Sequence, residues 1–219
     1  CGDCGVKSNC VSVMPKETEF GRKRAIDQSS CNKDYSCVKG FCPSFVTVHG
    51  GALRKGNKQP AGANIDSLFP AVAEPKQPDL SQPYGVLVTG VGGTGVVTVG
   101  ALIAMAAHLE GKSASVLDFT GFAQKGGSVL SFVRWADVPE RLNQVRIDTQ
   151  QADLVLACDM VVGASADALG TVKPGRTVVI ANTHELATAA FVRDPNANLH
   201  GTALIDKMRH AAGPERVLT

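Results

Sequence analysis

Six of the seven cysteines lie in the first 42 residues, where their spacing suits metal ligands. The six are Cys1, Cys4, Cys10, Cys31, Cys37 and Cys42. Cysteines crowded into one short segment indicate either disulfides or a metal site. Disulfides suit a small secreted domain, whereas this segment is joined to a sequence typical of cytosolic α/β proteins, in which thiols stay reduced. The sequence therefore predicts that these thiolates bind a metal.

Iron–sulfur and zinc are the two alternatives for this metal. A zinc ribbon requires two Cys-x2-Cys pairs, and only Cys1 and Cys4 have that spacing here. Cys42 is followed by Pro43. The bacterial ferredoxin run also ends in Cys-Pro, and its last cysteine binds a different cluster from the cysteines before it. We therefore expect iron–sulfur clusters of the [4Fe–4S] type, with zinc, or no metal at all, as the alternatives.

Exchange of the last cysteine between the two groups gives two sets of ligands. Cys42 joins Cys1 and Cys4 in one set, and Cys10 joins Cys31 and Cys37 in the other. Each set is one thiolate short of the four that a cluster requires, so the number of clusters stays open at one or two.

A second candidate site is the pattern Gly90-x-Gly92-Gly93-x-Gly95. It follows a short apolar run at 86–88 and precedes a long apolar stretch at 96–109, which predicts a strand, a glycine turn and a helix. Glycines let the backbone approach a pyrophosphate, and the free N–H groups at a helix start attract the anion. We expect this turn, with Thr94, to bind a phosphate-bearing ligand; a purely structural turn is the alternative.

Two further features follow the glycine turn. Asp118 ends an expected strand at 113–118, about 20 residues past the turn, where a dinucleotide-binding fold places the acid that binds a ribose hydroxyl. A strand-end cap is the equal alternative for Asp118. Gly126 and Gly127 precede an alternating strand at 128–135 and are also candidates for close approach to a ligand, with a simple turn as the alternative.

The expected fold class is α/β, with a Rossmann-like, largely parallel sheet. Strands at 152–159 and 175–182 alternate with a helix at 160–169, which is typical of a parallel sheet covered on both faces. Asp159 and Asn182 are expected to be caps, and Cys158 a buried core residue.

The chain divides into three predicted parts. Residues 1–48 form the cysteine-rich segment, in which 17–27 is a surface loop or short hairpin; residues 49–83, rich in proline and glycine, form a linker; residues 84–219 form the α/β domain. The chain is expected to be a fragment of a longer polypeptide, truncated at its C-terminus.

Composition excludes several function classes. A net charge of +2 and 44% hydrophobic residues in 219 give no reason to expect a nucleic-acid partner. The most apolar helix, 96–109, is shorter than the roughly 20 residues that a membrane span requires. No residue pattern for peptide, ester or nucleotide hydrolysis follows the glycine turn.

Together these motifs resemble the fused indolepyruvate ferredoxin oxidoreductases, which belong to the thiamine-dependent 2-oxoacid:ferredoxin oxidoreductases. The resemblance rests on the run from Gly90 to Thr98, on Gln124-Lys-Gly-Gly127, on Cys1-Gly-Asp-Cys-Gly and on the cysteine segment from Ser30 to Ser44. The α/β domain is similar to the gamma module of these enzymes. Thr94 and Lys125 stand where separate gamma subunits usually carry Gln and Arg, which fits the fused branch.

The resemblance implies a reaction, cofactors and partners. A 2-oxoacid, expected to be indolepyruvate, is decarboxylated on thiamine diphosphate with Mg, and its acyl group passes to coenzyme A. Electrons leave through the iron–sulfur clusters to ferredoxin, and the gamma module helps to hold coenzyme A. The implied setting is cytoplasmic, with the remaining domains or subunits of the oxidoreductase as partners and a homo-oligomer as the intact enzyme.

Two other classes remain open on the residues alone. One is an NAD(P)- or flavin-binding reductase with an iron–sulfur segment, in which the glycine turn binds a dinucleotide. The other is a non-catalytic electron-transfer or scaffold piece, in which that turn has no ligand. Because no thiamine-binding motif is found in this sequence, the isolated chain should not reduce a viologen dye with a 2-oxoacid, and any such activity would contradict the assignment.

The cysteine segment gives a direct prediction. After anaerobic purification, we expect about four irons and four acid-labile sulfides per chain for one cluster, or about eight of each for two, with a visible spectrum that bleaches with dithionite. Zinc without sulfide would contradict the iron–sulfur assignment.

Overall fold

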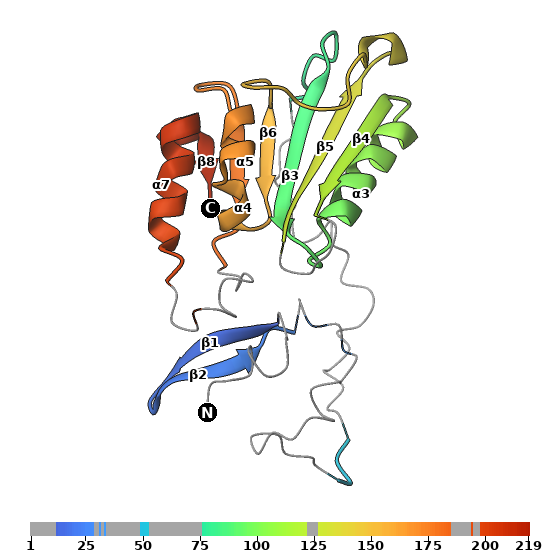
Figure 1. Cartoon of the computed structure of the whole chain (residues 1–219). Helices are drawn as coiled ribbons and strands as arrows, with labels where there is room; N and C mark the ends of the chain where they lie inside the picture. The colour runs from blue at the N-terminus through green and yellow to red at the C-terminus, as the bar shows by residue number, and fades with distance from the viewer. Residues whose placement is uncertain are drawn as a thin grey trace. The chain divides into compact units, whose positions relative to one another are not determined.

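The computed structural model describes residues 12–28, 31, 33, 49–52, 76–121, 127–184, 194 and 198–219 (Figure 1). The chain forms two compact units, one made of residues 1–34 and 79–219 and the other of residues 35–78. Residues 79–219 of the first unit, which we call the α/β unit, carry the glycine turn and are the part that the structure describes most completely. The predicted division at 48 and 83 therefore stays a prediction.

The segment between the predicted groups of cysteines forms an antiparallel hairpin. Strand β1 (Val13–Thr18) pairs with β2 (Gly21–Ile26). Gly21 has a φ of 83°, and the Thr18 hydroxyl donates a hydrogen bond of 2.7 Å to its carbonyl oxygen. The short hairpin expected at 17–27 is thus confirmed, although it starts at residue 13.

A six-stranded sheet forms the centre of the α/β unit, in the order β4-β5-β3-β6-β7-β8. In chain order the elements are β3 (Tyr84–Val91), α3 (Val96–Leu109), β4 (Ser113–Thr120), β5 (Ser128–Ala136), η2 (Pro139–Arg141), β6 (Leu154–Ala157), α4 (Met160–Gly163), α5 (Ala166–Thr171), β7 (Val178–Ala181), α7 (Gly201–Ala212), η3 (Pro214–Arg216) and β8 (Val217–Leu218).

Only β5 runs against the other strands of this sheet. It pairs in antiparallel fashion with both β3 and β4, whereas β3, β6, β7 and β8 pair in parallel. The prediction of a largely parallel sheet is confirmed. The chain leaves β3, crosses through α3 and returns as β4, so β5 later fills the position between them.

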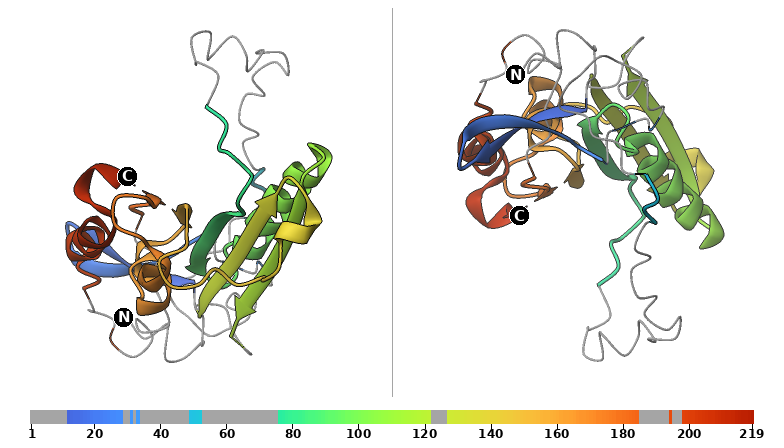
Figure 2. Two further views of the ribbon diagram at one scale, coloured as in Figure 1. Left: turned by 90° about the horizontal axis from the view of Figure 1, so that it is seen from above. Right: turned by 90° about the horizontal axis from the view of Figure 1, so that it is seen from below.

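Helices cover both faces of the sheet (Figure 2). On one face, Val86, Val88 and Val133 form a core with Val96 of α3. On the other face, a larger core joins the strands to α4 and α7; it contains Leu87, Phe132, Val155, Val179, Met160, Ile205 and Met208. Alternate residues of a strand point to opposite faces, which explains why the β3 residues 86 and 87 belong to different cores.

Glycine lets α3 approach the sheet closely. A Cβ at Gly100 would lie 2.2 Å from the Ser131 Oγ of β5, and real Cβ atoms essentially never come so near a neighbouring atom. A larger residue at this position would push the helix away from β5. Gly100 therefore fixes the height of α3 above the sheet.

Local patterns predicted most, but not all, of these elements. The helix expected at 96–109 is α3, and the strand expected at 128–135 is β5 with one more residue. The single helix expected at 160–169 is wrong, because Ser165 caps a new helix by accepting a hydrogen bond of 3.3 Å from the Ala168 N–H. Helix α7 was not predicted, since its first turn follows His200, which offers no side-chain cap.

None of the helices in the described ranges is long and apolar enough to cross a membrane.

Candidate functional site: the glycine turn at the carboxyl end of β3

The glycine turn joins β3 to α3, and its first glycine serves packing. Gly90 lies within β3, and a Cβ there would lie 2.6 Å from the Val96 Cγ2 at the start of α3. The same Cβ would lie 3.4 Å from the Cys158 Cβ. Gly90 is thus required for the helix to begin directly over the end of the strand, whether or not a ligand binds.

Gly93 and Gly95 serve the backbone conformation. Their φ angles are 90° and 93°, in the left-handed region that side chains other than glycine rarely adopt. Gly95 is the N-cap residue of α3 and offers no side chain to accept a hydrogen bond from the first turn. A Cβ at Gly95 would have no heavy atom of the described residues within 4 Å, so this point of the turn is open to them.

Thr94 closes the turn on itself. Its hydroxyl donates a hydrogen bond of 2.6 Å to the Val91 carbonyl oxygen, and its N–H donates one of 3.2 Å to the same atom. The hydroxyl proton is therefore engaged, and Thr94 offers a ligand its oxygen lone pairs rather than a donor. Its predicted role in ligand binding stays a prediction.

The structure brings the two glycine segments together. The Gly92 N–H donates a hydrogen bond of 2.7 Å to the Gly127 carbonyl oxygen. The cause is the antiparallel pairing of β3 and β5, which places Val91 opposite Ser128. Gly126 lies outside the described residues.

Free backbone donors remain at the start of α3. Within the described residues, the first hydrogen bond of the helix runs from the Val99 N–H to the Gly95 carbonyl oxygen and is 3.0 Å long. The Val96 and Val97 N–H groups form no backbone hydrogen bond with the described residues. Together with the positive end of the helix dipole, such groups form a natural anion site.

Asp118 lies apart from this turn. It is an exposed residue of β4, on the face covered by α3, and β5 separates β4 from β3. In a dinucleotide-binding fold the corresponding strand lies directly beside the first strand. Two strand spacings place Asp118 about 9–10 Å to the side, so this strand order gives no support to its predicted ribose contact. That role stays a prediction.

Asp159, which follows β6 at the same edge of the sheet, is fully buried. Its Oδ1 accepts a hydrogen bond of 2.9 Å from the Val162 N–H and so caps α4, as expected. Its Oδ2 has no hydrogen-bond partner in the described part of the chain. Burial raises the pKa of Asp159, because the charged carboxylate loses its hydration, and hydrogen bonds from Val162 and Val161 oppose this effect.

Asn182 and Cys158 lie at the same edge of the sheet, and a hydrogen bond joins the segments that follow β6 and β7. The Asn182 side chain donates a hydrogen bond of 3.2 Å to the Cys158 carbonyl oxygen and accepts one of 3.0 Å from the His184 N–H, as expected of a cap. Cys158 was expected to be buried but is half-buried, and loss of hydration raises the pKa of its thiol.

The predicted cluster ligands fall mainly outside the described residues. These are Cys1, Cys4, Cys10, Cys37 and Cys42. Cys31 is described, and its Sγ accepts a hydrogen bond of 3.3 Å from the Lys33 N–H. Over the described ranges, no group of three or more His, Cys, Asp or Glu residues could hold a metal. The iron–sulfur prediction therefore still rests on the sequence.

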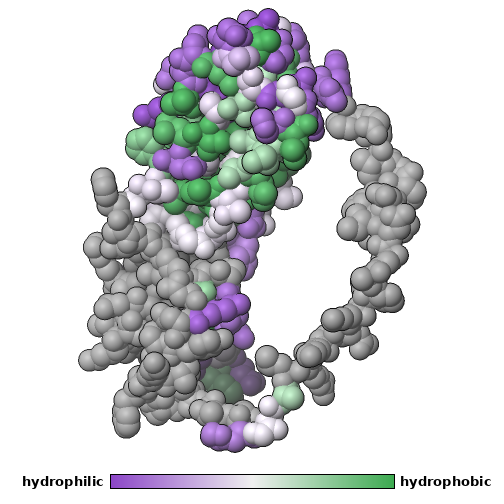
Figure 3. All heavy atoms as spheres, turned by 90° about the vertical axis from the view of Figure 1, so that its right-hand side faces the viewer, coloured by the Kyte–Doolittle hydropathy of each residue, from purple (hydrophilic) through white to green (hydrophobic). Residues whose placement is uncertain are grey.

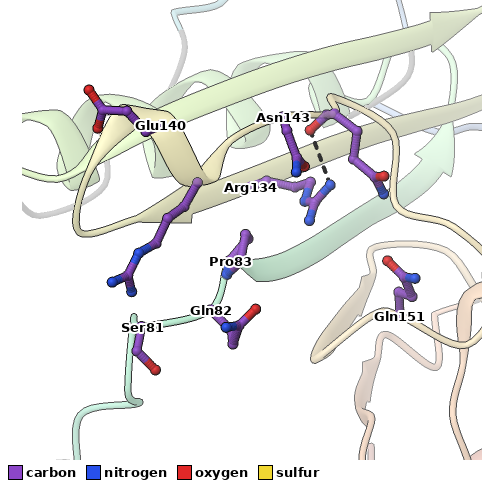
Figure 4. Close-up of a pocket in the computed structure, with 9 residues that line it drawn as sticks. Ser81, Gln82, Pro83, Arg134, Glu140, Asn143 and Gln151 are labelled. Carbon is purple, nitrogen blue, oxygen red and sulfur yellow. Dashed lines mark hydrogen bonds between the residues drawn. The ribbon is translucent and has the colours of Figure 1, made fainter.

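A polar hollow of about 480 Å³ lies at the opposite end of β3, beside Gln82 and Pro83 (Figure 4). Arg134 of β5 lines it and is 8% exposed. Its Nη1 donates hydrogen bonds of 3.1 Å to the Gln144 carbonyl oxygen and 3.4 Å to that of Arg146. Burial lowers the pKa of Arg134.

These contacts give Arg134 a structural role. It holds the loop that follows η2, and the hollow beside it lies at the amino end of the parallel strands. Ligands of open α/β sheets bind at the carboxyl ends. We therefore place the candidate site at the glycine turn rather than at this hollow, which the sequence patterns had not indicated.

Comparison with known proteins identifies the family of this chain. The family model described as pyruvate ferredoxin/flavodoxin oxidoreductase matches residues 85–213. The gamma subunit of NADH-dependent phenylglyoxylate dehydrogenase from Aromatoleum evansii is 33% identical over 108 residues, which are 49% of this chain and 55% of that protein. Indolepyruvate oxidoreductase subunit IorB from Archaeoglobus fulgidus is 32% identical over 136 residues, covering 61% and 60%.

A solved structure is also similar. The gamma subunit of a keto/oxoacid ferredoxin oxidoreductase from Geobacter sulfurreducens is 26% identical, with a TM-score of 0.35, and the match covers 46% of this chain and 51% of that one. The chain spans about half the length of the curated relatives it matches, with coverages of 55%, 48% and 50% for three of them.

The buried Asp159 gives a pH-dependent prediction. A carboxyl group whose pKa is raised on folding stabilises the fold below its unfolded pKa, and this contribution is lost as the pH rises through the folded pKa. Asp159→Asn keeps an N-cap oxygen but cannot ionise. The free energy of unfolding of Asp159→Asn, measured with urea, should therefore rise relative to that of the wild type as the pH increases above the ordinary Asp pKa of about 3.9.

The control is Asp159→Ala, which removes the cap as well. It should lose about 1 kcal/mol relative to Asp159→Asn at every pH, since the Val162 N–H loses its acceptor. If the difference in free energy of unfolding between the wild type and Asp159→Asn stayed constant with pH, it would show that folding does not raise the pKa of Asp159.

Proposed function

Because the chain belongs to the pyruvate ferredoxin/flavodoxin oxidoreductase family, we propose that its α/β unit is the coenzyme A-binding gamma module of a 2-oxoacid:ferredoxin oxidoreductase. The proposal assigns the phosphate groups of coenzyme A to the glycine turn. Indolepyruvate is the proposed 2-oxoacid, since three relatives named indolepyruvate oxidoreductase subunit IorB are 32% identical to this chain over 78, 78 and 136 residues.

One observation carries the proposal. The hydrogen bond from the Gly92 N–H to the Gly127 carbonyl oxygen joins two glycine segments directly before the free N–H groups of α3. A glycine turn serving only to reverse the chain would not require a second one beside it. Two adjoining segments without bulky side chains instead leave the backbone accessible to a large, charged group.

The residues present fit a phosphate group. Gly93 and Gly95 hold the turn in a left-handed conformation, and the Val96 and Val97 N–H groups face outward along the axis of a helix of 14 residues. The helix dipole adds a partial positive charge of roughly half an elementary charge at this end. In this proposal the turn binds and orients coenzyme A, and the chemistry of the acyl group takes place elsewhere in the enzyme.

The cysteine segment has a separate proposed task. Thiolate-bound iron–sulfur clusters accept and release single electrons, at potentials set by hydrogen bonds and exposure. We assign this task to the six cysteines of the first 42 residues, of which Cys31 lies in the described part of the chain. Thiamine diphosphate and Mg would be bound by other parts of the enzyme, because this sequence holds no motif for them.

The proposed partners follow from the same assignment. Ferredoxin would accept the electrons, and the remaining domains or subunits would supply the 2-oxoacid pocket. Two relatives, both from Thermococcus species, are named as the gamma subunit common to pyruvate and ketoisovalerate oxidoreductases. A cytoplasmic setting is proposed with them, since reduced thiolates are the state that clusters require.

A charge placed at the start of α3 tests the phosphate site. Val97 is 39% exposed in the first turn, and an acidic side chain there should stabilise the helix by about 0.3–1 kcal/mol through the dipole. The same charge should repel a phosphate. For Val97→Asp we therefore expect isothermal titration calorimetry to show coenzyme A binding at least tenfold weaker than in the wild type.

The matched control is Val97→Asn, which has nearly the same shape without the charge. Its affinity for coenzyme A should stay within about twofold of the wild type, and pantetheine, which lacks the phosphates, should not bind detectably. Equal affinities of the two variants, or no saturable binding by the wild type, would overturn the phosphate assignment.

A further inference from the structure

The polar hollow at the start of β3 adjoins a second one. The first has a volume of about 480 Å³ and the second of about 500 Å³. Four residues line both hollows: Gln82, Pro83, Arg134 and Gln151. Figure 3 shows mainly hydrophilic side chains at this end of the α/β unit, which carries η2 and the start of β3 and lies at the top of Figure 1. We call the two hollows together the amino-end groove.

Arg134 brings a buried positive charge to the amino-end groove. It is 8% exposed, and it forms no ion pair with a carboxylate of the described residues. Its Nη1 donates to two carbonyl oxygens of the loop after η2, whereas Nε and Nη2 donate no hydrogen bond to the described residues. Neither nitrogen is among the fully buried atoms without a partner, so both can be reached from the groove that Arg134 lines. The structural role of Nη1 therefore leaves the Nε–Nη2 edge of the guanidinium unused.

The two carboxylates whose charges act on Arg134 are engaged by other donors. The Asp153 Oδ1 accepts hydrogen bonds of 2.8 and 2.6 Å from Arg176, and its Oδ2 accepts one of 2.9 Å from a backbone N–H of β3. The Asp148 Oδ2 accepts one of 3.3 Å from a glutamine side chain. Burial lowers the pKa of Arg134, and these two carboxylates oppose that effect without touching it. Because buried charges are normally paired, the free edge of Arg134 has room for an anion.

Uncharged polar side chains line the groove together with Arg134. Gln82, Asn143 and Gln151 belong to this wall, and their carboxamides form no hydrogen bond with the described residues (Figure 4). A carboxamide both donates and accepts hydrogen bonds, as a hydroxyl group does, so each of them can pair with a hydroxyl group of a ligand. Gly85 lies opposite Arg134 in the pairing of β3 and β5 and adds no side chain that would fill the space.

The other charges of the groove nearly cancel one another. Arg176 and Arg141 each form an ion pair with an aspartate, at 2.6 and 3.4 Å. Glu140 and Lys173 are exposed and opposite in sign. Arg134 thus supplies one buried charge, which matches a ligand with a single negative charge. A carboxylate carries one such charge, whereas a phosphate group carries about 1.5 to 2 at neutral pH.

We propose that the amino-end groove binds a small hydroxy carboxylate, whose carboxylate pairs with Nε and Nη2 of Arg134 and whose hydroxyl groups pair with the surrounding carboxamides. An arginine and a carboxylate form two parallel, charge-assisted hydrogen bonds in this geometry. Pro83 and Ile147 are the apolar side chains that line the groove, so an alkyl or aryl ligand would gain little there. The site lies at the opposite end of β3 from the glycine turn and goes beyond the proposed binding of coenzyme A.

Gluconate is a suitable probe, because it carries one carboxylate and several hydroxyl groups. In ¹H–¹⁵N NMR spectra of the full 219-residue chain, the side-chain Nε–H signal of Arg134 should shift saturably as gluconate is added. We expect a Kd on the order of 1 mM, which suits a ligand of about a dozen non-hydrogen atoms. Glucose, which has the hydroxyl groups without the carboxylate, should leave the signal in place at the same concentrations. Inorganic phosphate should bind more weakly than gluconate.

Gln151→Glu adds a negative charge to the groove at almost the same shape and should weaken gluconate binding at least tenfold by repulsion. The matched control is Gln28→Glu, the same change at an exposed residue that lines neither hollow, and its Kd should stay within twofold of the wild type. Val97→Asp should also leave this Kd unchanged, so the test is independent of the coenzyme A assignment. An Nε–H signal that ignores gluconate or responds equally to glucose, tighter binding of phosphate, or equal affinities of the two glutamate variants would overturn the proposal.

Discussion

The antiparallel strand β5, placed between two strands that run the other way, is the constraint on which the rest of the α/β unit depends. Because β5 runs against β3, its first residues lie beside the last residues of β3, and Val91 pairs with Ser128. This pairing alone brings Gly127 to Gly92 and gives the hydrogen bond of 2.7 Å between them. In a fully parallel sheet, the residues before β5 would lie at the opposite edge, and the two glycine segments could not meet.

The same strand determines the position of α3. The helix must cross β5 to connect β3 with β4, and a close crossing requires a small residue, which Gly100 provides over Ser131. A second consequence is the displacement of Asp118 by one strand from the turn. The geometry that favours a phosphate site at the turn thus removes the adjacent acid on which a dinucleotide site depends.

Patterns local to one element predicted the structure well, and relations between elements did not follow from them. Helix α3 begins and ends at the residues expected, because a run of 14 residues without charge or proline favours one continuous helix. The position of β5 between β3 and β4 could not be read from the sequence, since alternation shows that a strand exists but not which neighbours it pairs with. For the same reason, the contact between Gly92 and Gly127 was not foreseen, although both residues were candidates.

Burial was the second quantity that the sequence did not reveal. Asp159 was expected to cap a helix, and it does so through Oδ1, but its complete burial depends on packing between β6, α4 and β3. Charged side chains are rarely buried without a partner for each oxygen. That Oδ2 has no hydrogen-bond partner among the described residues is therefore a property of the tertiary fold, and no pattern around residue 159 could have indicated it.

The glycines of this turn are required for two different reasons, packing and backbone conformation, which the sequence pattern alone does not distinguish. Gly90 is explained by packing, because any Cβ there would collide with Val96. Gly95 is not explained in that way, since a Cβ would meet no atom of the described residues within 4 Å, and the residue stands at the N-cap of α3. The φ of 93° explains this glycine instead, because it is strained for any residue with a side chain, so Ser, Asp or Asn could not cap the helix here without a change of backbone conformation. A glycine leaves the N–H groups of the first turn to water or to a ligand, which is the arrangement that an anion-binding helix start requires.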